Sequence, residues 1–163
     1  MHFYKILTIT ATIIALTGCG DSKPLKAVEL PTPKITASSQ LEKYGPEGLL
    51  SATQPGWHSS NPPKFPEWVM VDFQVSREVR LLGLLPQDGN PTRAPKSIHV
   101  EISNDGNSWS QAATSGDACS PNTPDGWSEI KFAKPVTARY LKIVILSNCG
   151  DPGLVTFRGL RLG

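Results

Sequence analysis

The sequence predicts an all-β protein, built as an antiparallel β-sandwich or barrel. No segment after Lys34 keeps the apolar periodicity of a helix, and short segments of alternating apolar and polar residues recur instead. Gly, Pro, Asn and Asp separate these segments. In IHVEIS (98–103), Ile98, Val100 and Ile102 fall on one face of a strand and the polar residues on the other. Short strands of this kind are typical of two-layer β architectures.

We expect eight segments to form strands, because each is rich in β-branched, aromatic or aliphatic residues and is bounded by turn residues. In chain order they are Ile35–Ser39, Trp68–Phe73, Val79–Leu85, Ile98–Ser103, Trp109–Ala113, Trp127–Phe132, Arg139–Leu146 and Val155–Leu162. The tightest turn is expected at Asn104-Asp105-Gly106-Asn107, since Asp-Gly suits a hairpin.

The strand order places the long connections together. If consecutive strands run antiparallel, the long loops meet at one end of the sandwich, which we call end A, and the short connections meet at the opposite end, end B. The end-A loops are 58–67, 86–97, 114–126 and 147–154, and the end-B connections are 74–78, 104–108 and 133–137. Long loops in a compact domain usually carry a function or a covalent constraint.

The N-terminus has the pattern of an export signal. Lys5 is followed by an apolar run over 6–16 that is too short to remain as a membrane span. The run ends in Leu16-Thr17-Gly18-Cys19, which resembles a bacterial lipobox and predicts cleavage after residue 18 and lipidation of Cys19. Acyl chains there would anchor the protein to a membrane. Gly20, where an Asp would favour inner-membrane retention, favours the outer membrane of the cell envelope. The alternative is a plain secretory signal.

Beyond the signal, we expect a tether over residues 19–34 and one domain over 35–163. The tether segment holds three prolines in GDSKPLKAVELPTPK (20–34) and shows no apolar periodicity. The chain carries 16 Lys and Arg against 14 Asp and Glu without a basic stripe. This balance argues against nucleic acid as the main partner.

Two cysteines remain once Cys19 is assigned to lipid. Cys119 and Cys149 fall in two different end-A loops, and their spacing does not suggest a metal or redox motif. An even pair in an oxidising compartment predicts a disulfide that joins the two loops. Two free thiols are the alternative.

Several motifs, in order along the chain, resemble the discoidin family. They are ITASSQ (35–40), GWHS (56–59), PEWVMVDF (66–73), PQDGN (86–90), VEISNDGNSW (100–109), PVTARYLKI (135–143) and FRGLRLG (157–163). This family comprises the coagulation-factor C-type domains of the galactose-binding-like superfamily, which includes many bacterial carbohydrate-binding modules. The resemblance implies an eight-stranded antiparallel jelly-roll β-sandwich. It also implies a binding module and not an enzyme.

The resemblance assigns different roles to the Trp-His pair. Sugar-binding members carry a His directly after the Trp, and that His contacts sugar hydroxyls, so His58 is expected to face the end-A cleft while Trp57 packs in the core. A neutral imidazole offers one donor and one acceptor, which suits a pair of hydroxyls. In the alternative, His58 is a surface residue that only hydrogen-bonds to loop backbone.

The end-A loops supply the other candidate ligand-binding residues. They are Gln87, Asp88, Asn90 and Arg93 in one loop and Asn148 and Asp151 in another. Relatives often have an Arg where this chain has Pro86, and we expect Arg93 either to replace that guanidinium or to pair with Asp88. Phe65 is the candidate exposed aromatic residue. Trp127 and Tyr140 lie in expected strands, where core packing is more common.

The sequence predicts no metal, no cofactor and no catalysis. Many relatives bind Ca²⁺ through an acidic loop, but LLSATQPG (49–56) contains no acid. No HExxH or GxSxG motif is present, and only Asp88 with Asp151 would suggest a glycosidase pair. The predicted function is therefore a membrane-anchored module that binds a carbohydrate at end A. The alternative is an envelope protein-interaction or scaffolding lipoprotein, which Pro86 favours.

Overall fold

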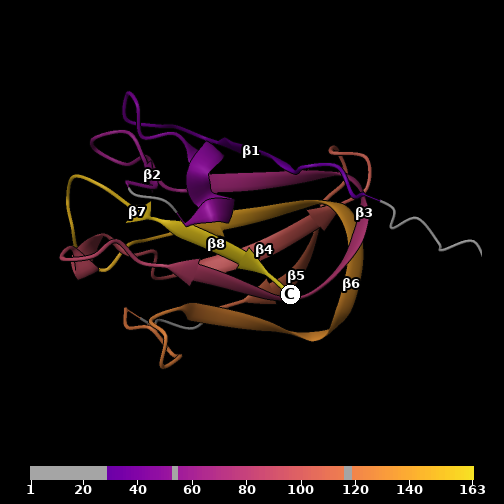
Figure 1. Cartoon of the computed structure of the whole chain (residues 1–163). Helices are drawn as coiled ribbons and strands as arrows, with labels where there is room; N and C mark the ends of the chain where they lie inside the picture. Colours follow the sequence, from indigo (N-terminus) through magenta and orange to yellow (C-terminus); the bar gives the residue numbers. More distant parts are fainter. Residues whose placement is uncertain (1–28, 53–54, 116–118) are drawn as a thin grey trace, which may run out of the picture.

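The computed structural model describes residues 29–52, 55–115 and 119–163, and these form an antiparallel β-sandwich (Figure 1). The all-β fold class predicted from the sequence is therefore confirmed. The elements are β1 (Lys34–Ala37), the 3₁₀ helix η1 (Pro46–Ser51), β2 (Trp57–His58), β3 (Glu67–Leu85), the 3₁₀ helix η2 (Pro91–Arg93), β4 (Ile98–Ser103), β5 (Ser110–Thr114), β6 (Ser128–Ile145), β7 (Thr156–Phe157) and β8 (Gly159–Leu162).

Two long strands, β3 and β6, form the frame of the sandwich. They pair antiparallel from Glu67 opposite Ile145 to Leu84 opposite Ser128, and both curve over end B from one layer to the other (Figure 1). The sequence predicted two separate strands in each of these segments. That prediction is wrong in detail, because 74–78 and 133–137 are bends within β3 and β6. Register shifts in the ladder absorb the bends, and both bends still lie at end B.

The remaining strands extend this ribbon into two layers. The path of the main sheet is β1-β3-β6-β4-β5, and β8 pairs with the second half of β3. β4 has the bounds predicted for it, whereas the predicted strand over 155–162 is divided into β7 and β8. β2 and β7 form a separate two-stranded sheet at end A. The sequence did not predict β2, which has only two residues.

The core fills the space between the layers. Alternate residues of β3, namely Val69, Val71 and Phe73, point inward and are almost fully buried. They meet Leu141 and Ile143 of β6, which are buried as well. Burying each such side chain stabilises the fold by about 1.5–3 kcal/mol, so the ribbon and the loops that it supports are held firmly.

The long loops gather at end A as predicted (Figure 1). Loops 86–97 and 147–154 lie side by side, with Pro95 bridged to Asn148 and the Cys149 amide donating to the Ala94 carbonyl at 3.0 Å. Cys119 and Cys149 form the predicted disulfide, with their Cα atoms 5.5 Å apart. Three of the four loops are therefore joined into one rim.

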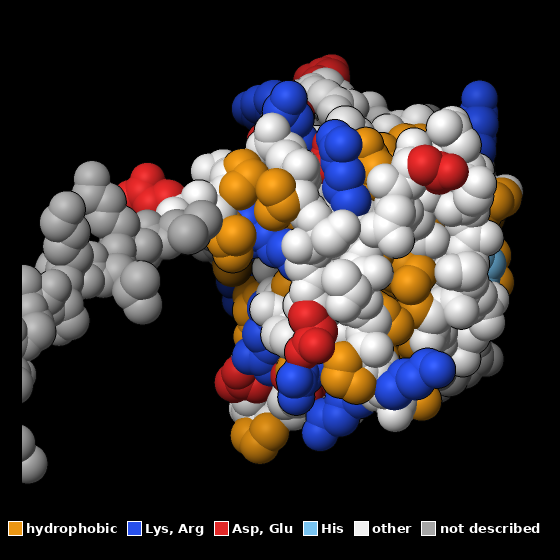
Figure 2. Space-filling model, turned by 90° about the vertical axis from the view of Figure 1, so that its right-hand side faces the viewer, with side chains coloured by type: hydrophobic (Ala, Val, Ile, Leu, Met, Phe, Trp, Pro, Cys, Tyr) orange, Lys and Arg blue, Asp and Glu red, His pale blue; other side chains and the backbone are white. Residues whose placement is uncertain are grey.

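The described N-terminal segment lies at the opposite pole. Gln74 and Arg77, in the bend of β3, donate hydrogen bonds to the carbonyls of Thr32 and Pro31. Figure 2 looks onto this end, where Lys and Arg side chains alternate with apolar ones close to the point at which the chain emerges. The chain thus enters the domain at end B, whereas the polar loops lie at end A.

Candidate functional site

The short ladder between β2 and β7 positions the Trp-His pair. Trp57 lies opposite Phe157 and His58 opposite Thr156. Trp57 is fully buried, packs edge-on against Phe157 with ring centroids 5.5 Å apart, and donates from Nε1 to the Ser39 carbonyl at 2.8 Å. The expectation that Trp57 belongs to the core is therefore confirmed.

His58 is buried, which corrects the expectation that it faces an open cleft. Only 5% of its surface is exposed, and its ring stacks on Tyr44 with centroids 4.3 Å apart and planes within 7°. Tyr44 lies in the chain between β1 and η1, and its backbone carbonyl accepts the His58 amide at 3.1 Å. No spacing in the sequence pointed to Tyr44, because the stack joins a loop residue to a residue of the short strand β2.

The environment of His58 keeps its ring neutral. Burial lowers the pKa of His58; the Pro55 carbonyl partly offsets this, and the positive charge of Arg93 lowers the pKa further. The Nδ1 atom is buried and has no well-formed hydrogen bond among the described residues. On the other side of the ring, Nε2 lies 3.4 Å from the amide nitrogen of Gln87. A neutral ring whose Nε2 accepts from Gln87 fits these surroundings.

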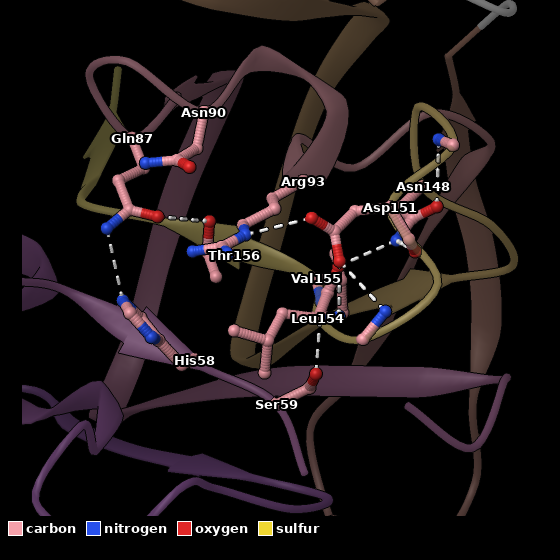
Figure 3. A network of polar contacts seen from close by, with 12 residues as sticks. His58, Ser59, Gln87, Asn90, Arg93, Asn148, Asp151, Leu154, Val155 and Thr156 are labelled. Atoms are coloured by element: carbon pink, nitrogen blue, oxygen red, sulfur yellow. Dashed lines mark hydrogen bonds and ion pairs between the residues drawn. The ribbon is translucent and has the colours of Figure 1, made fainter. Parts of the chain in front are cut away.

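Gln87 connects His58 to β7 (Figure 3). Its Oε1 accepts a hydrogen bond from the Thr156 hydroxyl at 3.1 Å, which orients the amide so that its NH₂ group faces His58. Gln87 itself is only partly buried. Thr156, fully buried, was not among the residues predicted from the sequence.

Arg93 is held by Asp151 at the centre of Figure 3. Arg93 Nε donates to Asp151 Oδ2 at 3.0 Å, and both side chains are mostly buried, at 29% and 18% exposure. Neither terminal nitrogen of Arg93 hydrogen-bonds to another described residue. The expectation that Arg93 pairs with Asp88 is therefore wrong. A guanidinium whose two terminal nitrogens have no hydrogen bond to the described residues lies near His58.

Asp151 is fixed by backbone contacts as well as by Arg93. Burial would raise the pKa of Asp151, but the Arg93 hydrogen bond and the amides of Gly153 and Leu154 outweigh it and lower that pKa. Both amides donate to Oδ1, at 2.8 and 2.9 Å. Asn148 closes the loop by donating from Nδ2 to the carbonyls of Asp151 and Leu154. Asn148 and Asp151 thus support Arg93.

Asp88 lies outside this network, whereas Asn90 joins it through its backbone, because the Arg93 amide donates to the Asn90 carbonyl at 3.1 Å (Figure 3). Asp88 pairs with Arg158 at 3.3 Å and its side chain is 78% exposed. Asn90 donates to the Asp88 carbonyl at 3.3 Å. Because Asp88 and Asp151 bind different arginines in separate networks, no hydrogen bond links them as a carboxylate pair.

The candidate aromatic residues are spread over the molecule. Trp127 packs under the Arg161 guanidinium at 4.6 Å, and Tyr140 packs against Trp109 near the end-B turn at Gly106. Phe65, in the loop before β3, is 39% exposed. Of the three candidates, Phe65 therefore offers the most accessible ring.

One buried carboxylate was missed by the sequence-based prediction. Glu67 is 1% exposed and begins β3, where its oxygens accept hydrogen bonds from the hydroxyls of Ser38 and Ser39 and from the Lys64 amide. This network ties β1 and the loop before β3 together at end A. The serines of ITASSQ and the Glu of PEW were the available signal, but only the fold brings them together.

Metal-ligand residues do not cluster in the described part of the chain. No group of three or more His, Cys, Asp or Glu side chains there is placed to hold an ion.

The architecture is thus an antiparallel β-sandwich whose long loops are joined into a polar rim at one end. The chain belongs to the F5/8 type C domain family, whose model matches residues 34–156. This confirms the family resemblance inferred from the motifs. A search of curated proteins gave no match.

Solved structures agree in fold. A family 32 carbohydrate-binding module of Clostridium perfringens in complex with GalNAc-β-1,3-galactose has a TM-score of 0.64 and 24% identity, over 80% of this chain and 94% of that one. A chitosan-binding module from Paenibacillus sp. IK-5 has a TM-score of 0.65 at 19% identity, over 80% and 93%. The family 32 module of C. perfringens NanJ, in complex with galactose, gives 0.62 at 16%, over 80% and 92%.

The membrane prediction concerns residues outside the described ranges. Within those ranges, no helix has the length and apolar character needed to cross a bilayer. The lipobox residues Leu16–Cys19 and the tether before Glu29 lie outside the described residues.

Proposed function

We propose that this chain is a non-catalytic module of the bacterial cell envelope that binds a carbohydrate through end A. The observation that carries the proposal is the Arg93 guanidinium, which Asp151 orients through Nε while both terminal nitrogens remain without a described partner. Paired N–H donors held in one plane suit the vicinal hydroxyls of a sugar. The names of similar folds, which include modules in complex with galactose and with GalNAc-β-1,3-galactose, support this class of ligand.

The site residues divide into contacts and supports. Arg93, Gln87 and Asn90 offer donors and acceptors to the ligand, and the exposed carboxylate of Asp88 adds an acceptor. His58 supports Gln87, because its Nε2 faces the Gln87 side-chain amide nitrogen. Asn148 and Asp151 hold Arg93 in place. Rigid placement of a few polar groups is what a shallow sugar site requires.

Attachment to the membrane is a second part of the proposal. The segment Leu16–Cys19 supports lipidation of Cys19, and Gly20 supports an outer-membrane location. Mass spectrometry of the mature N-terminal peptide tests this directly. A diacylglyceryl Cys19 is the expected result, whereas an unmodified N-terminus from a different cleavage site would contradict it.

Carbohydrate binding is tested with a broad glycan array, using the full-length chain and the Arg93→Ala variant. The wild-type chain should retain a defined set of glycans, and the variant should lose that set. Arg80→Ala is the matched control, because Arg80 is an exposed, ion-paired arginine at end B. Retention of the same glycans by Arg93→Ala would contradict the assignment of the site.

A protein-interaction module is the second candidate. Leu146 is 45% exposed and Phe65 39% exposed, and both flank the end of the β3–β6 ladder at end A. Exposed apolar side chains of this kind favour a protein partner, as does Pro86 at the position where sugar-binding relatives often have Arg. Crosslinking with mass spectrometry in intact envelopes distinguishes the two functions: a stoichiometric protein partner together with an empty glycan array would favour this one.

A further inference from the structure

A row of hydrogen-bonding groups at end A joins residues from three segments (Figure 3). The Thr156 hydroxyl of β7 donates to Gln87 Oε1 at 3.1 Å, and the Gln87 amide nitrogen lies 3.4 Å from Nε2 of His58 in β2. Thr156 is fully buried and His58 is 5% exposed, so bulk water cannot replace these partners. Part of the hydrogen-bonding capacity of the Gln87 amide is therefore used inside the protein.

The row has a defined direction. An amide nitrogen only donates, so His58 Nε2 is the acceptor and the neutral ring carries its proton on Nδ1. The Pro55 carbonyl, which acts on the ring as a hydrogen-bond acceptor, favours that form. If the amide were turned over, Oε1 would face the lone pair of Nε2, and two acceptors repel each other. His58 thus determines which end of the Gln87 amide points toward it.

The other half of the Gln87 amide is available to a ligand. Gln87 is half-buried and lines a groove at end A. Its second N–H and the second lone pair of Oε1 take no part in the row. These are the groups that Gln87 can offer at the proposed carbohydrate site, and their positions exchange when the amide turns over.

A proton on His58 Nε2 reverses the preferred orientation of the amide. An imidazolium carries N–H donors on both nitrogens, so Nε2 would direct a donor at the NH₂ group of Gln87. Half a turn of the amide brings Oε1 to Nε2 instead. The Thr156 hydroxyl, which can accept as well as donate, then accepts from the NH₂ group. Each donor of the row again faces an acceptor.

The charges near the ring leave Gln87 Oε1 as the acceptor for that proton. Arg93, in the loop 86–97, acts on His58 through its positive charge. Lys43 Nζ lies 5.9 Å from the centroid of the Tyr44 ring, which stacks on His58. Asp151 is engaged with Arg93 and with backbone amides. No carboxylate among the described residues forms an ion pair with His58.

We propose that His58 sets the orientation of the Gln87 amide, and that protonation of the ring turns the amide over. A ligand group that donates to Oε1 at neutral pH then meets an N–H, and one hydrogen bond of the site is lost. His58 and Thr156 are positioning residues, because they act on the ligand through Gln87. This inference rests on the proposed carbohydrate-binding function and adds proton-linked control of the same site.

The orientation of the amide can be measured by NMR on the isotope-labelled full-length chain without a ligand. At pH 7.5 the side-chain NH₂ protons of Gln87 should show NOEs to the His58 ring, and the imidazole nitrogen shifts should report a neutral ring with its proton on Nδ1. As the pH is lowered, the NOEs should move to the Thr156 methyl group in step with the titration of His58. NOEs that stay on His58 while the ring titrates overturn the proposal, as does unfolding of the protein before the ring titrates.

The effect on the ligand is measured by titration with a glycan that the array identifies. The affinity of the wild type should fall about fivefold as His58 becomes protonated, the scale of one hydrogen bond. His58→Phe keeps a ring to stack on Tyr44 but has no nitrogen, so its affinity should not change over the same pH range. His99→Gln, at the other described histidine, is the matched control and should follow the wild type. Melting temperatures at each pH confirm that the variants are folded.

The failure of this inference and the failure of the proposed function give different results. If glycans bind in a manner that depends on Arg93, but the NOEs do not move or His58→Phe loses affinity as the wild type does, only the control by His58 is overturned. If the NOEs move as expected and no glycan on the array binds, the carbohydrate-binding function is overturned, and the control of ligand binding with it.

Discussion

At the scale of single residues, His58 shows how burial changes the meaning of a motif. The Trp-His pair predicted an imidazole that faces the end-A cleft. The structure instead places the ring between Tyr44 and Gln87 with 5% exposure. A buried ring in this position supports Gln87 and does not itself face solvent. Its removal should therefore lower the stability of the fold.

His58→Ala should therefore destabilise the fold. The substitution leaves a cavity against Tyr44 and removes the contact to Gln87, and we expect a loss of about 2 kcal/mol in the free energy of unfolding. Urea unfolding followed by tryptophan fluorescence measures it. His99→Ala, at the more exposed of the two described histidines, is the control. A urea unfolding curve of His58→Ala identical to that of the wild type would show that packing of the His58 ring does not stabilise the fold.

The lowered pKa of His58 also predicts a dependence of stability on pH. Because burial depresses the folded-state pKa below the ordinary value of 6.5, the unfolded chain binds the proton more readily than the folded chain. The stability linked to the neutral ring is present above pH 6.5 and is lost as the pH falls through the folded-state pKa. The urea midpoint of the wild type should decrease when the pH is lowered from 7.5 to 5. The decrease should be smaller in His58→Gln, whereas His99→Gln should show the same decrease as the wild type.

The sequence identified part of the site and missed its supporting residues. Arg93 and Asp151 were both selected because planar polar groups concentrate in end-A loops, but their pairing with each other was not foreseen. The partner of a charged side chain depends on how two loops meet, which the bridge between Pro95 and Asn148 decides here. Tyr44 could not be selected at all, since its stacking on His58 arises only in the folded chain.

At the scale of elements, the alternation of apolar residues located the strands but not their continuity. β4 has the predicted bounds because Ile98, Val100 and Ile102 alternate without interruption. β3 and β6 were each divided in two, because the polar residues at 74–78 and 133–137 look like turns. In the structure these residues bend a continuous ladder. A bend and a turn share the same polar composition, so only the pairing partner distinguishes them.

The glycine before Trp57 should be indispensable for the β2–β7 ladder. Gly56 has φ +74°, and a Cβ there would lie 2.3 Å from the Arg158 Cα and 2.6 Å from the Phe157 carbonyl oxygen. Gly89 has nearly the same φ, +73°, with no atom within 4 Å of a Cβ. Gly89→Ala should cost about 1 kcal/mol, from the left-handed backbone alone. Gly56→Ala should cost at least about 2 kcal/mol more. Equal losses in urea unfolding would contradict the close contact.

The disulfide should contribute stability as well as rigidity. It closes a segment with a sequence separation of 30, and restricting the unfolded chain over that length contributes about 3–4 kcal/mol. Cys119→Ser with Cys149→Ser should lose about that much in urea unfolding, and reduction of the wild type should match the double variant. Unfolding of the double variant and of the oxidised wild type at the same urea concentration would show that the disulfide does not stabilise the fold.

At the scale of the whole molecule, the N-terminal segment and the loop rim lie at opposite poles. The described N-terminal segment is bound to the β3 bend at end B through Gln74 and Arg77, while the loop rim is at end A (Figure 1). If Cys19 is lipidated as proposed, the rim faces away from the membrane. The proposed ligand would then bind on the side of the domain that points away from the membrane.

This orientation can be measured on vesicles that carry the lipidated chain. A fluorophore on a cysteine introduced at Asn90, in the rim, should transfer less energy to a lipid-phase acceptor dye than one at Lys134, in the end-B bend. The reason is that energy transfer falls steeply with the distance from the bilayer. Equal transfer from both positions would show that the domain tumbles freely on its tether.

The place where the chain enters has a mechanical consequence. β1 begins at end B and runs toward end A beside β3, with Lys34 opposite Asp72 and Ala37 opposite Val69. If the rim binds a fixed glycan as proposed, and the chain is pulled from its N-terminal side, the force runs along β1. The hydrogen bonds of β1 with β3 are then loaded in shear, all at once, and are not broken one by one. A strand pair loaded in this way resists pulling better than one whose hydrogen bonds break in sequence.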